Sequence, residues 1–197
     1  PVNRRQRQMC IRDRYIDVSG QSFRAFMDGK LPGFEGQLPS MEDFEDHITT
    51  AFPEVRLKGY IEMRGADSGS WGSICALPAL WVGLLYDEES LNAAEALVSG
   101  ISAQQVEAAR LSALTNGLDG QFAGQPMLVI AREMVALSDA GLARRKITDS
   151  KGSDETQYLN PLKEIVTTGK TNADIMLDHY NSDWDRDVRN LFKLYHY

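Results

Sequence analysis

Residues 55–64 read VRLKGYIEMR, and apolar and polar side chains alternate along them with glycine at position 59. Ten residues at a period of two predict one long β-strand, with an apolar face toward a core and a polar face opposite. The polar face carries Arg56, Lys58, Tyr60, Glu62 and Arg64. A strand cannot stand alone, because its backbone needs hydrogen-bonded neighbours. Since few other strands are in sight, the sheet is expected to be built largely by residues missing upstream of this chain.

The polar face of this strand has two interpretations. A carboxylate beside several cations suits a polyphosphate site, in which the carboxylate holds Mg²⁺ and guanidinium groups neutralise the phosphates. A solvent-facing edge strand protected by its charges has the same composition. On period and composition alone, the edge strand is favoured, because charged strand faces usually meet solvent.

The predicted secondary structure changes along the chain from strands and loops to helices. Ser40, with Asp43 three residues later, predicts the start of a helix that ends before Pro53. Residues 65–72 form a turn-rich loop, and the chain from residue 73 onward is predicted to be helical. Residues 74–86 form a nearly all-apolar helix that is expected to be buried on most sides. The predicted fold class is therefore α+β, with strands and loops over residues 15–72 and helices over residues 73–197.

Composition narrows the class of protein. The chain is 43% hydrophobic and 25% charged, as in soluble globular proteins, and its net charge of −7 argues against a general nucleic-acid binder. The apolar run of residues 74–86 is too short to span a bilayer, so no membrane partner is expected. The two cysteines, Cys10 and Cys75, cannot form a disulfide framework and fit a reducing compartment. A cytoplasmic protein is predicted.

The first fourteen residues differ from the rest. They hold five arginines and one acidic residue, show no apolar period and begin with proline. Residues 1–14 are therefore interpreted as a non-native leader fused to the remainder.

A longer stretch around the strand resembles a known family. Residues 46–58 read DHITTAFPEVRLK, residues 60–67 read YIEMRGAD, Trp71 follows, and residues 75–87 read CALPALWVGLLYD. These segments resemble the plant and proteobacterial type of glutamate–cysteine ligase, a member of the glutamine synthetase-like ligases with a curved antiparallel active-site sheet. The resemblance covers most of the chain after the leader, and it reverses the preference for a plain edge strand.

The resemblance implies roles for the polar face. In the superfamily, the Glu-x-Arg pair binds Mg²⁺ and the transferring phosphoryl group, which makes Glu62 a metal ligand and Arg64 the catalytic phosphoryl-stabilising residue. Arg56, Lys58 and Tyr60 are weaker candidates for substrate or nucleotide binding. The implied reaction uses ATP to phosphorylate the γ-carboxyl of glutamate, and the amine of cysteine then attacks the acyl phosphate. It is the first step of glutathione biosynthesis.

The chain also departs from the family. The positions that match the regulatory disulfide of the plant members are Val18 and Gly33, so that switch is expected to be absent. The family's N-terminal half, with further metal-binding carboxylates and much of the glutamate pocket, has no counterpart here. The chain is therefore expected to be a C-terminal fragment that is inactive alone. Two alternatives remain: a ligase that uses another amine, and a non-catalytic helical interaction module.

Overall fold

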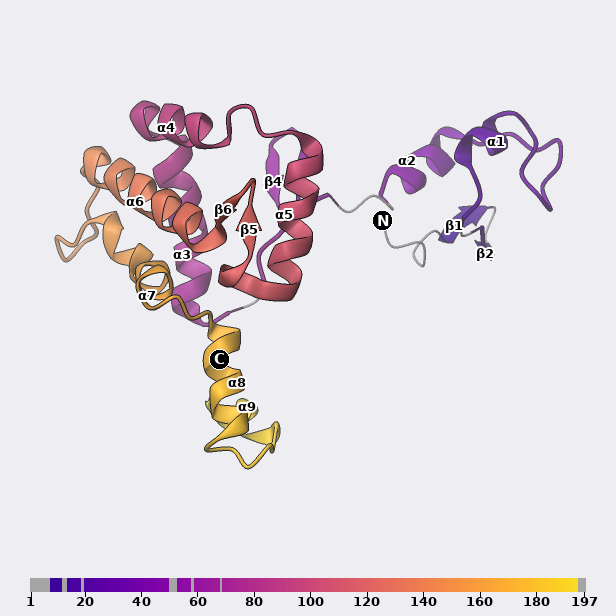
Figure 1. Ribbon diagram of the computed structural model, residues 1–197. Helices are drawn as coiled ribbons and strands as arrows, with labels where there is room; N and C mark the ends of the chain where they lie inside the picture. Colours follow the sequence, from indigo (N-terminus) through magenta and orange to yellow (C-terminus); the bar gives the residue numbers. More distant parts are fainter. Residues whose placement is uncertain are drawn as a thin grey trace. The chain divides into compact units, whose positions relative to one another are not determined.

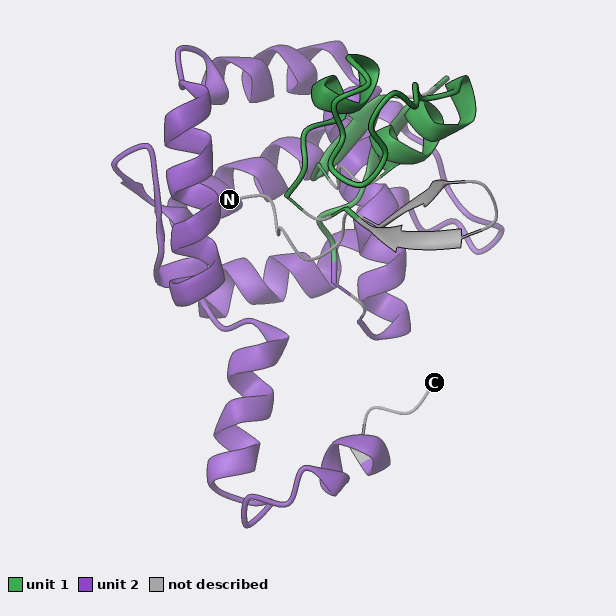
Figure 2. Ribbon diagram, turned by 90° about the vertical axis from the view of Figure 1, so that its right-hand side faces the viewer, with its two compact units in different colours: residues 1–66 green, residues 67–197 purple. Residues whose placement is uncertain are grey.

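The computed structural model describes residues 8–11, 14–18, 20–49, 53–57, 59–67 and 69–194. The chain forms two compact units, residues 1–66 and residues 67–197 (Figure 2). The boundary between them falls inside the stretch that was predicted to be a turn-rich loop.

The first unit contains short strands and two helices. In chain order they are β1 (Gln8–Ile11), β2 (Arg14–Asp17), α1 (Phe23–Met27), α2 (Met41–Thr49), β3 (Val55–Leu57) and β4 (Ile61–Met63). β1 and β2 are antiparallel, with Gln8 opposite Asp17 and Ile11 opposite Arg14. β1 lies within the predicted leader of residues 1–14, whose foreign origin stays a prediction.

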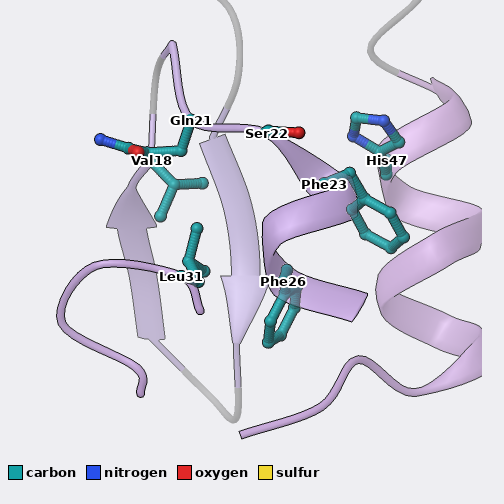
Figure 3. A pocket seen from close by; sticks show the side chains of 7 residues that line it. All are labelled: Val18, Gln21, Ser22, Phe23, Phe26, Leu31 and His47. Carbon is teal, nitrogen blue, oxygen red and sulfur yellow. The ribbon is translucent and has the colours of Figure 1, made fainter. Parts of the chain in front are cut away.

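A small apolar core holds α1 and the loop after it. Val18, Phe26 and Leu31 are buried together, and Phe23 and Phe34 pack against them. Phe23 also stacks on the His47 ring of α2, with ring centroids 4.3 Å apart. Figure 3 shows Val18, Phe23, Phe26, Leu31 and His47 around a hollow of about 10 Å³, which is room for one water molecule at most. This core ties α1 to α2 and leaves no space for a substrate.

The stretch 55–64 is a hairpin, and the prediction of one ten-residue strand is wrong. β3 and β4 are antiparallel, with Val55 opposite Met63, Arg56 opposite Glu62 and Leu57 opposite Ile61. Each pair joins two odd or two even positions, because three residues separate the strands. The alternation therefore continues unbroken through the turn, and period alone cannot distinguish this hairpin from a single strand.

The second unit is almost entirely helical (Figure 1). Its helices are α3 (Trp71–Leu85), α4 (Glu88–Val98), α5 (Ala103–Asn116), α6 (Met127–Arg145), α7 (Asn160–Thr168), α8 (Asn172–Asn181) and α9 (Arg189–Leu194). Short 3₁₀ turns η2 (Gly117–Asp119) and η3 (Glu155–Leu159) and a two-stranded hairpin, β5 (Gln121–Phe122) and β6 (Gln125–Pro126), connect them.

The centre of this unit is the contact between α3 and α6. The two helices approach closely because small residues face each other. A Cβ on Gly141 would lie 2.0 Å from the carbonyl oxygen of Gly83, and a Cβ on Gly83 would lie 2.3 Å from that of Ser138. Ser138 is fully buried, and its hydroxyl donates to the carbonyl oxygen of Leu80 at 3.0 Å. No larger side chain fits at either glycine without separating the helices.

α3 is less buried than its composition predicts. Ala76, Gly83 and Leu84 are its buried residues, and they share the side that faces α6. Its other side carries exposed apolar side chains, namely Trp71, Ile74, Leu77 and Leu85. Burial on most sides was therefore a wrong prediction for this helix, because a helix packed along one face buries only that stripe however apolar the rest is.

Several helices begin at a side-chain cap, and the cap predicted at Ser40 is confirmed. Ser40 and Asp43 bond each other's backbone N–H groups ahead of α2. Asp87 caps α4, and Ser102 caps α5 through a capping box with Gln105. The described residues are mostly helical with small antiparallel sheets, which agrees with the α+β class.

Candidate active-site residues on the β3–β4 hairpin

The hairpin brings Arg56 and Glu62 face to face. They are directly opposed across the two strands, so their side chains leave the same face of the ladder. Arg64 follows Glu62 by two residues, and its backbone N–H donates to the carbonyl oxygen of Glu54 at 2.8 Å, which continues the pairing beyond β4. Three of the five predicted polar residues thus gather on one side of the hairpin.

We call Arg56, Glu62 and Arg64 the Arg–Glu–Arg cluster. Arg56 reaches Oε2 of Glu62 with both Nε and Nη2, each at 2.7 Å. Nη1 of Arg64 approaches the same oxygen at 3.4 Å. The three side chains are only 25 to 30% exposed. The two contacts of Arg56 are short and charge-assisted, and they orient the Glu62 carboxylate.

The other two predicted residues are Tyr60 and Lys58. Tyr60 is in the turn between the strands and is 61% exposed, outside the Arg–Glu–Arg cluster. Lys58 lies outside the described residues. The position of Arg56 in the sequence does not show which residue it meets. Only the fold places Arg56 against Glu62.

The apolar side of the hairpin does not meet a core. Val55, Leu57 and Ile61 are all exposed, and Leu57 is 80% exposed. The expectation of a core-facing apolar strand face is wrong for these residues, because a two-stranded ladder has too few neighbours to cover either face.

The donor set suits an anion better than a lone cation. Two guanidinium groups and one carboxylate leave the Arg–Glu–Arg cluster with a formal charge of +1. Within the described ranges, no three His, Cys, Asp or Glu side chains lie together as a metal site would need. Mg²⁺ is commonly held by one or two carboxylates together with substrate phosphates and waters. Glu62 fits one ligand of such a site, and the remaining ligands would come from a phosphate or from other residues.

A second polar group, which the sequence did not predict as a unit, joins α6 to α4. Arg144 donates to both carboxylate oxygens of Asp87 at 2.7 to 3.1 Å and to the Ser90 hydroxyl at 2.8 Å. The Arg144 guanidinium, and after it the backbone N–H of Ser90, hold the pKa of Asp87 well below its usual range. Asp87 also caps α4, and its partner Arg144 lies 57 residues away in the sequence. These contacts are internal and brace the helices.

An open hollow of about 350 Å³ lies between α3, α6 and η3, with Cys75, Glu155 and Tyr158 among its lining residues. Glu155 is paired with Arg145 at 3.0 Å. Cys75 is half-buried, although the helix that carries it was expected to be buried on most sides. None of the described helices is both long and apolar enough to cross a bilayer.

Comparison with known proteins places the chain. Residues 4–193 match the sequence model of glutamate–cysteine ligase family 2. The chain belongs to this family. The chloroplastic glutamate–cysteine ligase of Nicotiana tabacum is 45% identical over 180 residues, which is 91% of this chain and 33% of the tobacco enzyme. The chloroplastic enzyme of Arabidopsis thaliana is 43% identical over 182 residues, covering 92% of this chain and 34% of that enzyme. Glutamate–cysteine ligase A of Oryza sativa subsp. indica is 44% identical, with 91% and 35% covered.

The relatives bear on two predictions, the fragment and the location. The chain spans about a third of the length of the curated relatives it matches, which fits the predicted fragment. The predicted cytoplasmic location is wrong by this comparison, because these relatives are chloroplastic and point to the plastid. The physical reason is that a scarcity of cysteines excludes a disulfide framework without distinguishing one reducing compartment from another.

Proposed function

We propose that this chain is the C-terminal part of an ATP- and Mg²⁺-dependent ligase that joins the γ-carboxyl of glutamate to the amine of cysteine. The reaction passes through an acyl phosphate on glutamate and begins glutathione biosynthesis. The observation that carries the proposal is the Arg–Glu–Arg cluster, which lies within the residues matched by the family. It concentrates positive charge around one oriented carboxylate, as phosphoryl transfer requires.

Each residue of the hairpin has a proposed role. Arg64 stabilises the phosphoryl group in transfer, because its guanidinium can share charge with two phosphate oxygens. Glu62 would supply one ligand to Mg²⁺, and the ion would help to neutralise the charge of the phosphates. Arg56 orients Glu62 and contacts phosphate, while Tyr60 and Lys58 are candidates for binding substrate or nucleotide.

The remainder of the site is proposed to come from the part of the protein that matches the other two-thirds of its relatives. That part would add strands beside β3 and β4 in a glutamine synthetase-like sheet and cover the exposed Val55, Leu57 and Ile61. It would also supply the further carboxylates of the metal site. The 197-residue chain is therefore inactive by itself.

A chimera tests this function. The matching third of the tobacco enzyme is replaced by this chain, and γ-glutamylcysteine formation is measured with ATP, Mg²⁺, glutamate and cysteine. We expect activity from the chimera and none from the chain alone. A folded, soluble chimera without activity would overturn the proposal, and a panel of other amines identifies the acceptor.

Two substitutions locate the chemistry in the chimera. Glu62→Gln and Arg64→Lys should each lower the turnover by roughly 100-fold, because each removes a contact made to the charges that move during transfer. Glu45→Gln and Arg24→Lys make the same chemical changes at exposed positions of the first unit and should leave turnover unchanged. Equal effects at the paired positions would show that the hairpin is not in the active site.

A further inference from the structure

The open hollow between α3, α6 and η3 lies in the second unit, and none of its lining residues belongs to the β3–β4 hairpin. Its volume is about 350 Å³. Small-molecule sites in proteins have volumes of about 300 to 1,000 Å³, mostly apolar walls and a few polar groups that orient the ligand. The hollow therefore has the size of a small ligand site, and its side chains decide which ligand fits.

The walls of the hollow are apolar. α3 contributes four residues at spacings of three and four along the helix, namely Cys75, Pro78, Ala79 and Val82. Such spacings place side chains on one face of a helix. α6 adds the side chain of Leu142. A ring or a short apolar chain can bury part of its surface against these residues, which favours binding through the hydrophobic effect.

The other lining residues come from η3. Glu155 and Tyr158 are three residues apart, and side chains at that spacing leave the same side of a 3₁₀ turn. Arg145 donates to Oε2 of Glu155 at 3.0 Å, and no hydrogen bond from the described residues reaches Oε1. The Tyr158 hydroxyl also has no partner in the part of the chain that the structure describes. The hollow thus offers one carboxylate oxygen that can accept and one hydroxyl that can donate.

We propose that this hollow binds a small uncharged molecule with an apolar ring and a primary amide. The ring lies against the apolar walls, the amide N–H donates to Oε1 of Glu155, and the amide carbonyl accepts from the Tyr158 hydroxyl. A carboxylate in the same place would be repelled by Glu155, and an ammonium group would lie near the Arg145 guanidinium. A neutral group that both donates and accepts avoids both penalties.

Benzamide is the probe, and the alkylation of Cys75 by N-ethylmaleimide is the readout. Cys75 lines the hollow and is half-buried, so a molecule bound there should slow the reaction. Mass spectrometry of the peptides follows Cys75, with Cys10 as an internal reference whose rate should not change. The benzamide concentration that halves the rate gives a dissociation constant, which we expect on the order of 1 mM.

A matched probe and a matched variant test the two polar contacts. Acetophenone has the shape of benzamide with a methyl group in place of NH₂, so it should bind about fivefold more weakly for want of an N–H for Glu155. Tyr158→Phe removes one hydroxyl and should weaken benzamide binding by about fivefold. Tyr180→Phe makes the same change in α8 and should stay within about twofold.

The same reaction is measured in the tobacco chimera, because the rest of a full-length ligase could fill the hollow. We expect Cys75 to react there and benzamide to slow it. The proposal is overturned if benzamide up to about 20 mM leaves the Cys75 rate unchanged, if acetophenone protects equally well, if Tyr158→Phe binds benzamide like the parent, or if polypeptide already shields Cys75 in the chimera. Far-UV circular dichroism checks that Tyr158→Phe is folded. No ligase activity enters this assay, so its failure and the failure of the proposed function are distinguishable.

Discussion

The β3–β4 hairpin and the α3–α6 contact use apolar residues in opposite ways. In the helix pair, Leu84 and Leu142 are each 1% exposed, and two glycines bring the backbones together. In the hairpin, the apolar side chains are exposed and the ordered contacts are those of the Arg–Glu–Arg cluster. The helix pair is completed by residues of this chain and supplies stability. The hairpin is organised on its charged side, which is where the proposed chemistry lies.

The largest expected effect is at the helix pair. Gly141→Ala places a methyl group 2.0 Å from a backbone oxygen that cannot move without displacing α3, so it should lower the free energy of unfolding by about 3 kcal/mol. Urea unfolding followed by far-UV circular dichroism measures this loss. Ala136→Val adds volume on the exposed side of α6 and is the control. Equal losses from the two variants would show that the helices do not meet at Gly141.

A smaller loss is expected from the polar contacts between α4 and α6. The Ser90 hydroxyl is fully buried, donates to the carbonyl oxygen of Leu137 at 2.8 Å and accepts from Arg144. Ser90→Ala leaves both groups without this partner and should lower the free energy of unfolding by about 2 kcal/mol. Ser99→Ala, at the exposed end of the same helix, should change it little. A Ser90→Ala variant as stable as the parent would contradict the contact.

Acid should reveal the Asp87–Arg144 pair. The folded-state pKa of Asp87 is lowered, chiefly by Arg144, below the unfolded value of about 3.9. The ionised carboxylate therefore stabilises the fold fully above about pH 5, and this contribution is lost as the pH falls from about 4 through the folded-state pKa. Asp87→Asn should be less stable than the parent near neutral pH, and the difference should shrink in acid.

Urea midpoints between about pH 3 and pH 7 measure this convergence. Glu95→Gln removes an exposed carboxylate from the same helix and controls for net charge. A stability gap between Asp87→Asn and the parent that stays constant down to pH 3 would show that the ionised carboxylate is not what Arg144 stabilises.

The smallest effect is expected on the hairpin. Leu57→Lys replaces a side chain that is 80% exposed, so the free energy of unfolding of this chain should change by no more than about 0.5 kcal/mol. Leu84→Ala, at a buried leucine, is the contrast and should cost about 2 to 5 kcal/mol. A comparable loss from Leu57→Lys would show that the hairpin face is covered in solution, and the comparison between the two regions would fail.

The amino-acid sequence by itself determined the family, the start of α2 and the composition of the charged face, whereas α3 begins at Trp71, inside the predicted loop. Caps such as Ser102 with Gln105 act within four residues, so they can be read locally. Arg56, Glu62 and Arg64 were predicted to lie on one face of a single strand. They still share one face in the hairpin, because the three-residue turn preserves the alternation of sides. Only the tertiary structure decided that residues 55–64 fold back as a hairpin, which sets Arg56 against Glu62. It alone also revealed the approach of Gly83 to Gly141 and the reach of Arg144 to Asp87. Two of these contacts join residues that are far apart in the sequence, and the turn of the hairpin leaves no break in the alternating pattern. Neither secondary-structure propensity nor periodicity shows which segments of a chain meet.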